Sequence, residues 1–420
     1  MEEDGGEQME VEDGEAWGPG SREEDGEEEE DEDEEEEEDE PWLLGFAEAV
    51  EDARLLRARY FPSKLGGRPA WLDPERVPSG DGFECGVCGE PLSFLAQAYC
   101  PLQGGRPEGF HRTVLVFVCR HGACMRAASR PGAEVVRVLS CELPRRNPYF
   151  SYDPPPDPGE GDGDEVLDGA GAAPLCAHCG TWAVAPGGGQ GRFCSAWCRA
   201  RAESGKPPRL HLAEHELGIE DDQGEVTEAE LTDAERRYLE RFRAGDLHPS
   251  GLGAGVGHEA GQDGGDGGGQ AGGDGALDDG VLEASFGPRA GTPEQVAWAR
   301  FQLAIANRPS QVLRHANGVA RRKPVLPRPG LLPDEDALQG RTFEFQILPQ
   351  ALFYVQQRGE GEGEGDRAHL GSLDFSTLAV YTHQGDEPRR GPGYHEEVAY
   401  LQASEDLRPQ LQPDDPPASA

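Results

Sequence analysis

The sequence has no long apolar run and no leader-like start. No stretch of it approaches the roughly 18 apolar residues that a membrane-spanning helix needs. It opens with Glu2, Glu3 and Asp4, where a secretory leader would carry basic residues followed by an apolar segment. We therefore expect a chain without a membrane partner, in a reducing compartment, where paired cysteines are more often metal ligands than disulfides.

Positive charge is scarce. The 420 residues include 38 Lys and Arg against 81 Asp and Glu, for a net charge of −43. Residues 1–40 hold 25 acidic residues against Arg22, and every residue from Glu27 to Glu40 is acidic. Such a segment repels itself and has nothing to pack, so the pattern predicts a disordered tail over residues 1–41. The tail is either a solvating bristle, meaning a disordered and solvated segment with no specific partner, or a mobile counter-charge for a very basic partner.

Runs rich in glycine, proline and acid interrupt the segments able to form a core. The chain has 59 Gly and 35 Pro, and these runs divide it. The strand and helix patterns between the runs predict an α+β fold, mainly β. The predicted low-complexity parts are a linker at 154–174, an acidic and Gly-rich region at 216–291 with one short helix at 232–243, and a disordered tail at 404–420. The predicted folded parts are a β domain at 42–153, a small cysteine module at 175–215 and a C-terminal domain at 292–403.

Apolar patterns predict strands in both larger domains. Thr113 to Cys119 alternates β-branched and aromatic residues with no polar face, as in a strand buried on both sides. Thr342 to Leu348 alternates with Phe343, Phe345 and Ile347 expected to face inward. Further strands are predicted at 42–46, 135–139, 378–382 and 396–401. A helix is predicted from Thr292, because Thr, Pro and Gln occupy its N-cap, first and third positions.

Eight of the ten cysteines fall into two quartets with metal-ligand spacing. Each quartet is a Cys-x-x-Cys pair, a gap and a second close pair, an arrangement that brings four thiolates to the corners of a tetrahedron around zinc. The first quartet is Cys85, Cys88, Cys119 and Cys124, and the second is Cys176, Cys179, Cys194 and Cys198. Because the first quartet joins the ends of two strands, it predicts a zinc ribbon. Disulfides are the competing interpretation, which a reducing compartment disfavours.

Four thiolate ligands leave no open coordination position, so both predicted zinc ions are structural. His111 and His121 lie near the first quartet and could replace one of its later cysteines. Cys100 and Cys141 are left over, and Cys100 is predicted to be a small buried apolar residue. No catalytic dyad and no phosphate-binding loop stands out, so we expect no enzymatic activity.

Six segments stand out for their content and order. They are Ser63–Leu72, Cys85–Leu95, Tyr99–Leu102, Phe110–Arg112, Leu143–Tyr152 and Phe343–Gln350. Together they resemble the programmed cell death protein 2 family. The chain resembles the founding member more than the "-like" paralogue, because a MYND-type finger separates its halves.

The finger departs from the family pattern. A full MYND finger binds two zinc ions through seven Cys and one His, whereas the second quartet matches the two pairs that share one zinc. Gly187 to Gly191 replaces the middle pair, and His211 and His215 do not supply a second site. The resemblance therefore implies a degenerate finger with one zinc, and two zinc ions in the whole chain. Asp334 to Gln339 also stands where the family carries a further cysteine pair.

The resemblance implies one β body built from the N- and C-terminal parts, with the finger inserted. It also implies a non-enzymatic chaperone that binds a basic ribosomal protein of the small subunit and escorts it from cytoplasm to nucleus, with effects on proliferation and cell death. An acidic chain suits such a client. The alternative is a nuclear regulator of proliferation and apoptosis that contacts chromatin-associated proteins or DNA through the finger. Direct DNA binding is disfavoured, because the acidic field repels a phosphate backbone and the finger lacks a basic recognition helix.

Overall fold

The structure of the chain is a computed structural model. It describes residues 40–102, 107–128, 134–158, 173–184, 192–205, 211–222, 293–306, 308–330, 332–356, 373–384 and 392–404. Most of the predicted tails, the linker at 154–174 and the predicted helix at 232–243 lie outside these residues. Within the described ranges, no helix is both long enough and apolar enough to span a bilayer.

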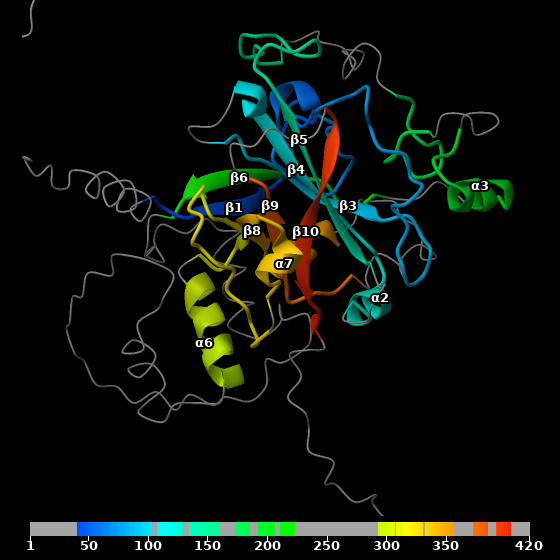
Figure 1. The fold of residues 1–420 in the computed structure, drawn as a ribbon. Coiled ribbons are helices and arrows are strands. Elements are labelled where there is room, and N and C mark those ends of the chain that lie inside the picture. The colour runs from blue at the N-terminus through cyan, green and yellow to red at the C-terminus, as the bar shows by residue number, and fades with distance from the viewer. Residues whose placement is uncertain are drawn as a thin grey trace, which may run out of the picture. The chain divides into compact units, whose positions relative to one another are not determined.

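In the unit that begins at Pro41, ten strands form a closed barrel, and every pair of neighbouring strands is antiparallel (Figure 1). The strands are β1 (Leu43–Glu48), β2 (Lys64–Leu65), β3 (Ser93–Tyr99), β4 (His111–Val118), β5 (Val136–Leu143), β6 (His215–Asp221), β7 (Gln311–His315), β8 (Thr342–Ile347), β9 (Thr377–Thr382) and β10 (Tyr394–Gln402). The described helices are η1 (Ala58–Tyr60), η2 (Pro107–Gly109), α2 (Gly122–Arg126), α3 (Ala196–Glu203), α6 (Pro293–Ala306), α7 (Glu335–Leu338) and α8 (Gln350–Val355). The mainly β, α+β fold class is confirmed.

Two seams join the N- and C-terminal parts of the chain into one barrel. The strand order is β1-β6-β2-β3-β4-β5-β10-β9-β8-β7, and β7 closes back onto β1. One seam is therefore β1 against β7, and the other is β5 against β10. The expectation of a single β body built from both parts is confirmed.

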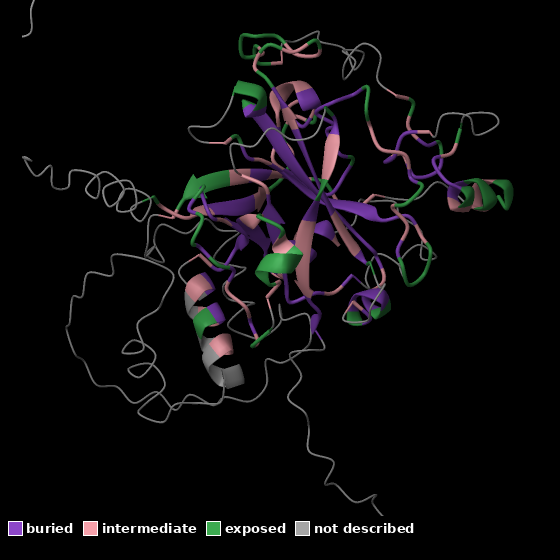
Figure 2. Cartoon of the chain, in the orientation of Figure 1, coloured by how far each residue is buried: buried purple, intermediate pink, exposed green. Residues whose placement is uncertain are grey.

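Strand β4 is buried on both faces, as its sequence predicts. All eight of its residues are buried (Figure 2). Arg112 reaches Glu344 on the non-adjacent strand β8, so that face of β4 points into the barrel. Because side chains alternate along a strand, Phe117 lies on the other face. There it packs against Trp182 and Trp71, at ring-centroid distances of 4.4 and 5.8 Å.

The prediction that Phe343, Phe345 and Ile347 of β8 all face the core is only partly correct. A bulge between Phe343 and Phe345 interrupts its pairing with β9. Phe345 and Ile347 lie in the main core, but Phe343 packs in a separate cluster with Ala379 and Tyr381. A bulge shifts the alternation of a strand, and here it allows Glu344 to point toward Arg112.

Strand β6 forms in the acidic region where the sequence predicts no strand. His215–Asp221 pairs with β1 over six residue pairs and lies between β1 and β2 in the barrel. Its apolar alternation is short, and its last three residues are exposed, which explains why the sequence gives a weak strand signal.

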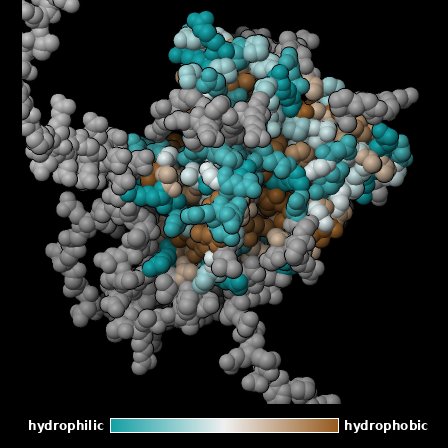
Figure 3. Space-filling view, in the orientation of Figure 1, coloured by the Kyte–Doolittle hydropathy of each residue, from teal (hydrophilic) through white to brown (hydrophobic). Residues whose placement is uncertain are grey.

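The described surface in the view of Figure 3 is largely hydrophilic, with apolar residues toward the centre.

Candidate metal centres

The first quartet collects at one end of strands β3 and β4. Cys85 and Cys88 lie on the turn that precedes β3, Cys119 directly follows β4, and Cys124 lies in α2. The four sulfur atoms lie within 4.8 Å of one another. Three of the four residues are buried, and Cys88 is exposed. The structure therefore brings together the four cysteines that spacing alone predicts.

The second quartet forms around the start of α3. Cys176 and Cys179 lie on a turn, Cys194 precedes the helix, and Cys198 lies in its first turn. The hydroxyl of Ser195 accepts from the backbone N–H of Cys198 at 3.3 Å and so caps the helix. All four cysteines are buried, and their sulfur atoms lie within 4.8 Å of one another.

The two Cys-x-x-Cys turns share one backbone geometry. In each turn, the sulfur of the first cysteine accepts a hydrogen bond at 3.4 Å from the backbone N–H two residues further on. The carbonyl of the same cysteine accepts a second hydrogen bond at 2.8 Å, from the N–H of the glycine that follows the second cysteine. The glycine has a φ of +71° in one turn and +63° in the other, which favours glycine. The residues are Cys85, Val87 and Gly89 in the first turn and Cys176, His178 and Gly180 in the second. Donors aimed at a sulfur stabilise its thiolate, the form that binds metal.

The sulfur separations fit zinc and do not fit disulfides. The distance is 3.7 Å from Cys88 Sγ to Cys119 Sγ, 3.6 Å from Cys179 Sγ to Cys194 Sγ and 3.7 Å from Cys194 Sγ to Cys198 Sγ. Tetrahedral zinc with bonds of about 2.3 Å places its sulfur ligands roughly 3.8 Å apart, whereas a disulfide bond is about 2.05 Å long. The ten cysteines are free thiols. Each quartet is thus a closed site that could hold one tetrahedral metal ion.

The pKa values of the quartet thiols also bear on metal binding. Hydrogen bonds from Cys119 and Cys88 lower the pKa of Cys85 to about 2, and the hydrogen bond to Cys85 raises the pKa of Cys119. The second quartet has the same asymmetry, because hydrogen bonding among its thiols lowers the pKa of Cys176 and raises that of Cys194. The pKa is therefore lowered for one thiol of the first quartet, Cys85, and for two of the second, Cys176 and Cys179. Keeping all four as thiolates at these distances requires the charge of a bound metal ion.

The two candidate histidines differ in their relation to the first quartet. His121 Nδ1 lies 3.5 Å from Cys88 Sγ and 3.7 Å from Cys119 Sγ, so this ring borders the quartet. His111 instead stacks on Phe61, with ring centroids 4.0 Å apart, and its Nδ1 lies 3.0 Å from the hydroxyl of Tyr99. The four cysteines already form a complete tetrahedral set, with His121 beside it.

Trp182, which sequence reasoning missed, attaches the second quartet to the barrel. Its side chain is fully buried and stacks on Phe83, with ring centroids 4.5 Å apart. Its ring N–H donates to the carbonyl of Leu92 at 3.4 Å, and the ring N–H of Trp71 donates to the carbonyl of Thr181 at 3.1 Å. The sequence signal was a tryptophan three residues after the Cys-x-x-Cys pair. The second quartet is consequently docked on the N-terminal part of the barrel through apolar packing.

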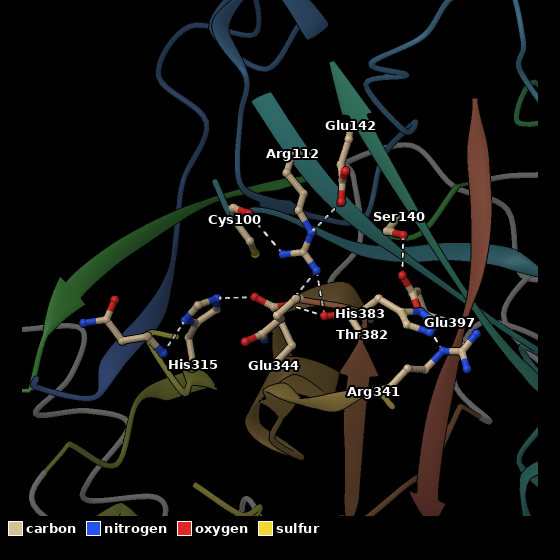
Figure 4. A network of polar contacts seen from close by, with 12 residues as sticks. Cys100, Arg112, Ser140, Glu142, His315, Arg341, Glu344, Thr382, His383 and Glu397 are labelled. Atoms are coloured by element: carbon tan, nitrogen blue, oxygen red, sulfur yellow. Dashed lines mark hydrogen bonds and ion pairs between the residues drawn. The ribbon is translucent and has the colours of Figure 1, made fainter. Parts of the chain in front are cut away.

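A polar network lies inside the barrel, between residues of the two halves (Figure 4). The guanidinium of Arg112 donates to Glu344 Oε2 at 2.7 Å, to Thr382 Oγ1 at 2.6 Å and to the carbonyl of Cys100 at 3.1 Å. His315 Nδ1 accepts from the backbone N–H of Asn317 at 2.8 Å, so the ring proton on Nε2 is donated to Glu344 Oε1 at 3.1 Å. Every strong donor around Glu344 therefore favours its ionised form.

Cys100, His315 and Glu344 also come close enough to hold a metal ion. Arg112 already neutralises Glu344 there, and a second cation would be repelled by the guanidinium. Burial raises the pKa of the Cys100 thiol well above its usual value, which disfavours the thiolate. Cys100 is buried, as the sequence predicts, and this cluster is better described as an internal ion pair than as a metal site.

A second polar cluster lies at the seam between β5 and β10. Glu397 on β10 accepts from the hydroxyl of Ser140 on β5 at 2.6 Å and from Arg341 Nε at 2.9 Å. His383 Nδ1 lies 3.3 Å from the same carboxylate (Figure 4). These contacts join residues of the N- and C-terminal parts of the chain at this seam.

The fold and the sites define a class of protein: a closed antiparallel barrel made from both ends of the chain, with two four-cysteine sites of the structural-metal type. The chain belongs to the programmed cell death protein 2 family. The family's N-terminal domain profile matches residues 41–157, and the profile described as its C-terminal putative domain matches residues 295–403. These two ranges contain most strands of the barrel and the whole first quartet.

Two relatives that carry the family's name match this chain over most of their length, and a third matches over about a quarter. The chain is 30% identical over 367 residues to programmed cell death protein 2 of Rattus norvegicus, which covers 86% of this chain and 95% of the rat protein. It is 31% identical over 383 residues to the Mus musculus protein of that name, and the match covers 86% of this chain and 96% of the mouse protein. With programmed cell death protein 2-like of Homo sapiens it shares 34% identity over 108 residues, or 26% and 28% of the two chains. No solved structure matches this chain.

Proposed function

We propose that this chain is a zinc-containing, non-enzymatic chaperone that binds a basic ribosomal protein of the small subunit during ribosome assembly. The observation that carries the proposal is charge: 81 acidic residues against 38 Lys and Arg, with 25 of the acidic residues in the first 40 positions. A strongly acidic surface attracts a basic client and screens it from nucleic acid. The family resemblance supplies the identity of the client class.

In this proposal the eight quartet cysteines hold two zinc ions with a structural role. Four thiolates fill the coordination of each ion, so no position is left for a water or a substrate. This closed coordination supports a binding protein over a metal-dependent enzyme. The metals contribute to folding, and the first stabilises the turns at the ends of β3 and β4.

Cell death and proliferation enter the proposal as consequences of the binding role. The relatives carry the name programmed cell death protein 2. We extend an effect on cell death and proliferation to this chain, caused by a failure to deliver the client. The chain would act in the cytoplasm, where the client is made, and in the nucleus, where the client joins the subunit.

Affinity purification from cells tests the proposal. The tagged full chain is captured with nuclease present, across a series of salt concentrations, and its companions are identified by mass spectrometry. The expected result is one basic small-subunit ribosomal protein, near stoichiometric and insensitive to nuclease. Its absence at low salt would overturn the proposal.

A variant without residues 1–40 separates the two interpretations of the acidic tail. A counter-charge role predicts that this variant binds the client more slowly than the full chain, with a smaller effect of salt on the rate, because 25 acidic residues are removed. Equal rates and equal salt dependence for both chains would favour the solvating bristle.

A second candidate is a nuclear regulator that binds chromatin-associated proteins through the second quartet. Its supporting observation is α3, which carries the exposed Arg199, while Arg201 lies over the Trp197 ring at 5.1 Å from its centroid. In the same purification, this function predicts chromatin proteins without any ribosomal protein. The net charge of −43 makes direct DNA binding the weakest form of this candidate.

A further inference from the structure

Strand β6 is paired along the whole of one edge and along a small part of the other. On one side, β1 pairs with every residue from Glu216 to Asp221. On the other side, β2 pairs with His215 and Glu216, and the N–H of Leu217 donates to the carbonyl of Ser63 at 3.1 Å. Across the ranges that the structure describes, no strand pairs with this second edge beyond Leu217.

The backbone groups on this edge follow from the register. The N–H of Asp222 donates to the carbonyl of Trp42, so Asp222, Glu220 and Gly218 direct their backbone groups toward β1. By alternation, the N–H and C=O groups of Ile219 and Asp221 point toward the open edge. The N–H of Leu217 also points toward this edge, where it donates to the carbonyl of Ser63, and this confirms the alternation.

Local geometry explains why the neighbouring strand stops. The two-residue strand β2 is preceded by η1, and Phe61 at the end of η1 has a φ of +50°. If the register of β2 with β6 continued, Phe61 would face Ile219, and a left-handed residue is not in the extended conformation that a strand requires. The outer part of β6 is therefore exposed, as Figure 2 shows at the end of this strand.

The open edge is acidic. Residues 215–222 include Glu216, Glu220, Asp221 and Asp222 and no Lys or Arg. Arg308 pairs with Glu220 at 2.9 Å, which still leaves the strand negative. Ile219 adds an apolar side chain that is 38% exposed. Acidic residues on an edge oppose pairing with a second copy of the same edge, but they favour a strand that carries opposite charge.

We propose that the open edge of β6 binds its client as an added β-strand, and that the bound segment is extended and rich in Lys or Arg. Backbone hydrogen bonds to Ile219 and Asp221 give affinity for any extended chain, and the acidic side chains select a basic one. This inference rests on the proposed function and names the form in which the basic client is bound.

The test removes one edge donor without altering the pairing with β1. Ile219→Pro deletes an N–H that points to the open edge, a position where an edge strand tolerates proline. Ile219→Ala loses the same side chain but keeps the N–H, and so is the matched control. The probe is a labelled ten-residue peptide that alternates Arg with Val, and its binding to the full-length chain is measured by fluorescence anisotropy.

Wild type and Ile219→Ala should bind the peptide within about twofold of each other, and Ile219→Pro about tenfold more weakly. Added salt should weaken the binding, and a peptide that alternates Glu with Val should not bind. Equal binding by the proline and alanine variants would overturn the proposal, as would binding of the Glu peptide. Unchanged melting temperatures show that both variants fold.

Capture from cells separates this inference from the proposed function. If wild type captures a basic ribosomal protein and Ile219→Pro captures it equally well, the edge is not the site and the proposed function stands. If wild type binds the Arg peptide in the predicted pattern but captures no ribosomal protein, the edge stands and the proposed function fails.

Discussion

Arg112 and Glu344 form an ion pair inside the barrel, with 2.7 Å between Nη2 and Oε2, although 232 residues separate them in the sequence. Arg112 belongs to β4 in the N-terminal part and Glu344 to β8 in the C-terminal part. Both side chains are almost completely buried. A buried pair specifies which groups must meet, and removal of one partner leaves the other charged and without its counter-ion in the core.

We expect Arg112→Ala to destabilise the barrel by about 3–5 kcal/mol, because Glu344 would remain buried without its cation. Denaturant unfolding measures the loss. The control is Arg137→Ala, which removes ion pairs with Glu134 and Glu396, both more than half exposed. That change should cost about 1 kcal/mol or less. A similar cost for both variants would mean that the internal pair contributes no more than a surface pair.

The same pair predicts a loss of stability in acid. Burial alone would raise the pKa of Glu344, but Arg112 and the hydrogen bond from His315 hold it well below its usual value. A carboxyl of this kind contributes stability that is present above its unfolded pKa, about 4.3, and is lost as the pH falls through the folded pKa. The unfolding free energy of wild type should therefore fall more steeply below about pH 4.3 than that of Glu344→Gln.

Acid should release any metal held by the quartets equally from wild type and Glu344→Gln, so the difference between their pH profiles isolates the contribution of the Glu344 carboxyl to stability. Parallel profiles for the two proteins below that pH would assign the acid sensitivity to other groups.

Cys88→Ser should remove one zinc ion of two and lower the melting temperature, because a three-thiolate site loses much of the metal's contribution to folding. Metal analysis of the purified protein counts the ions. Cys141→Ala is the matched control, since Cys141 is buried but belongs to neither quartet. An unchanged zinc content in Cys88→Ser, or an equal loss in Cys141→Ala, would show that the first quartet is misassigned.

Gly80→Ala should weaken zinc binding at the second quartet while the first keeps its ion. A Cβ atom at Gly80 would lie 2.5 Å from Cys194 Sγ, so the added methyl displaces a ligand. In this variant, one of the two zinc ions should transfer to a chelator faster than it does in wild type. Gly109→Ala is the control, because its Cβ would meet its nearest neighbour at an ordinary 3.5 Å. Identical transfer rates in both variants would contradict the close packing of Gly80 on Cys194.

The sequence predicts the cysteine quartets well, because ligand spacing is local information. Strand β4 was also predictable, since an unbroken β-branched and aromatic run suits burial on both faces. Strand β6 was not, because its outer residues are charged and exposed and its pairing with β1 joins positions far apart in the chain.

The Arg112–Glu344 pair could not be derived from patterning. A strand pattern assigns apolar residues to the interior, whereas here a bulge in β8 turns a glutamate inward beside Phe345. Trp182 was missed for a related reason. Its burial depends on Phe83 and Phe117, which the sequence does not show to be its neighbours.

Native mass spectrometry of the full chain, captured gently from cells, measures its zinc content and its bound client in one experiment. We expect a complex of one chain, two zinc ions and one basic ribosomal protein of the small subunit. A chain that carries no zinc, or one that is recovered without any basic ribosomal protein at low salt, would contradict it.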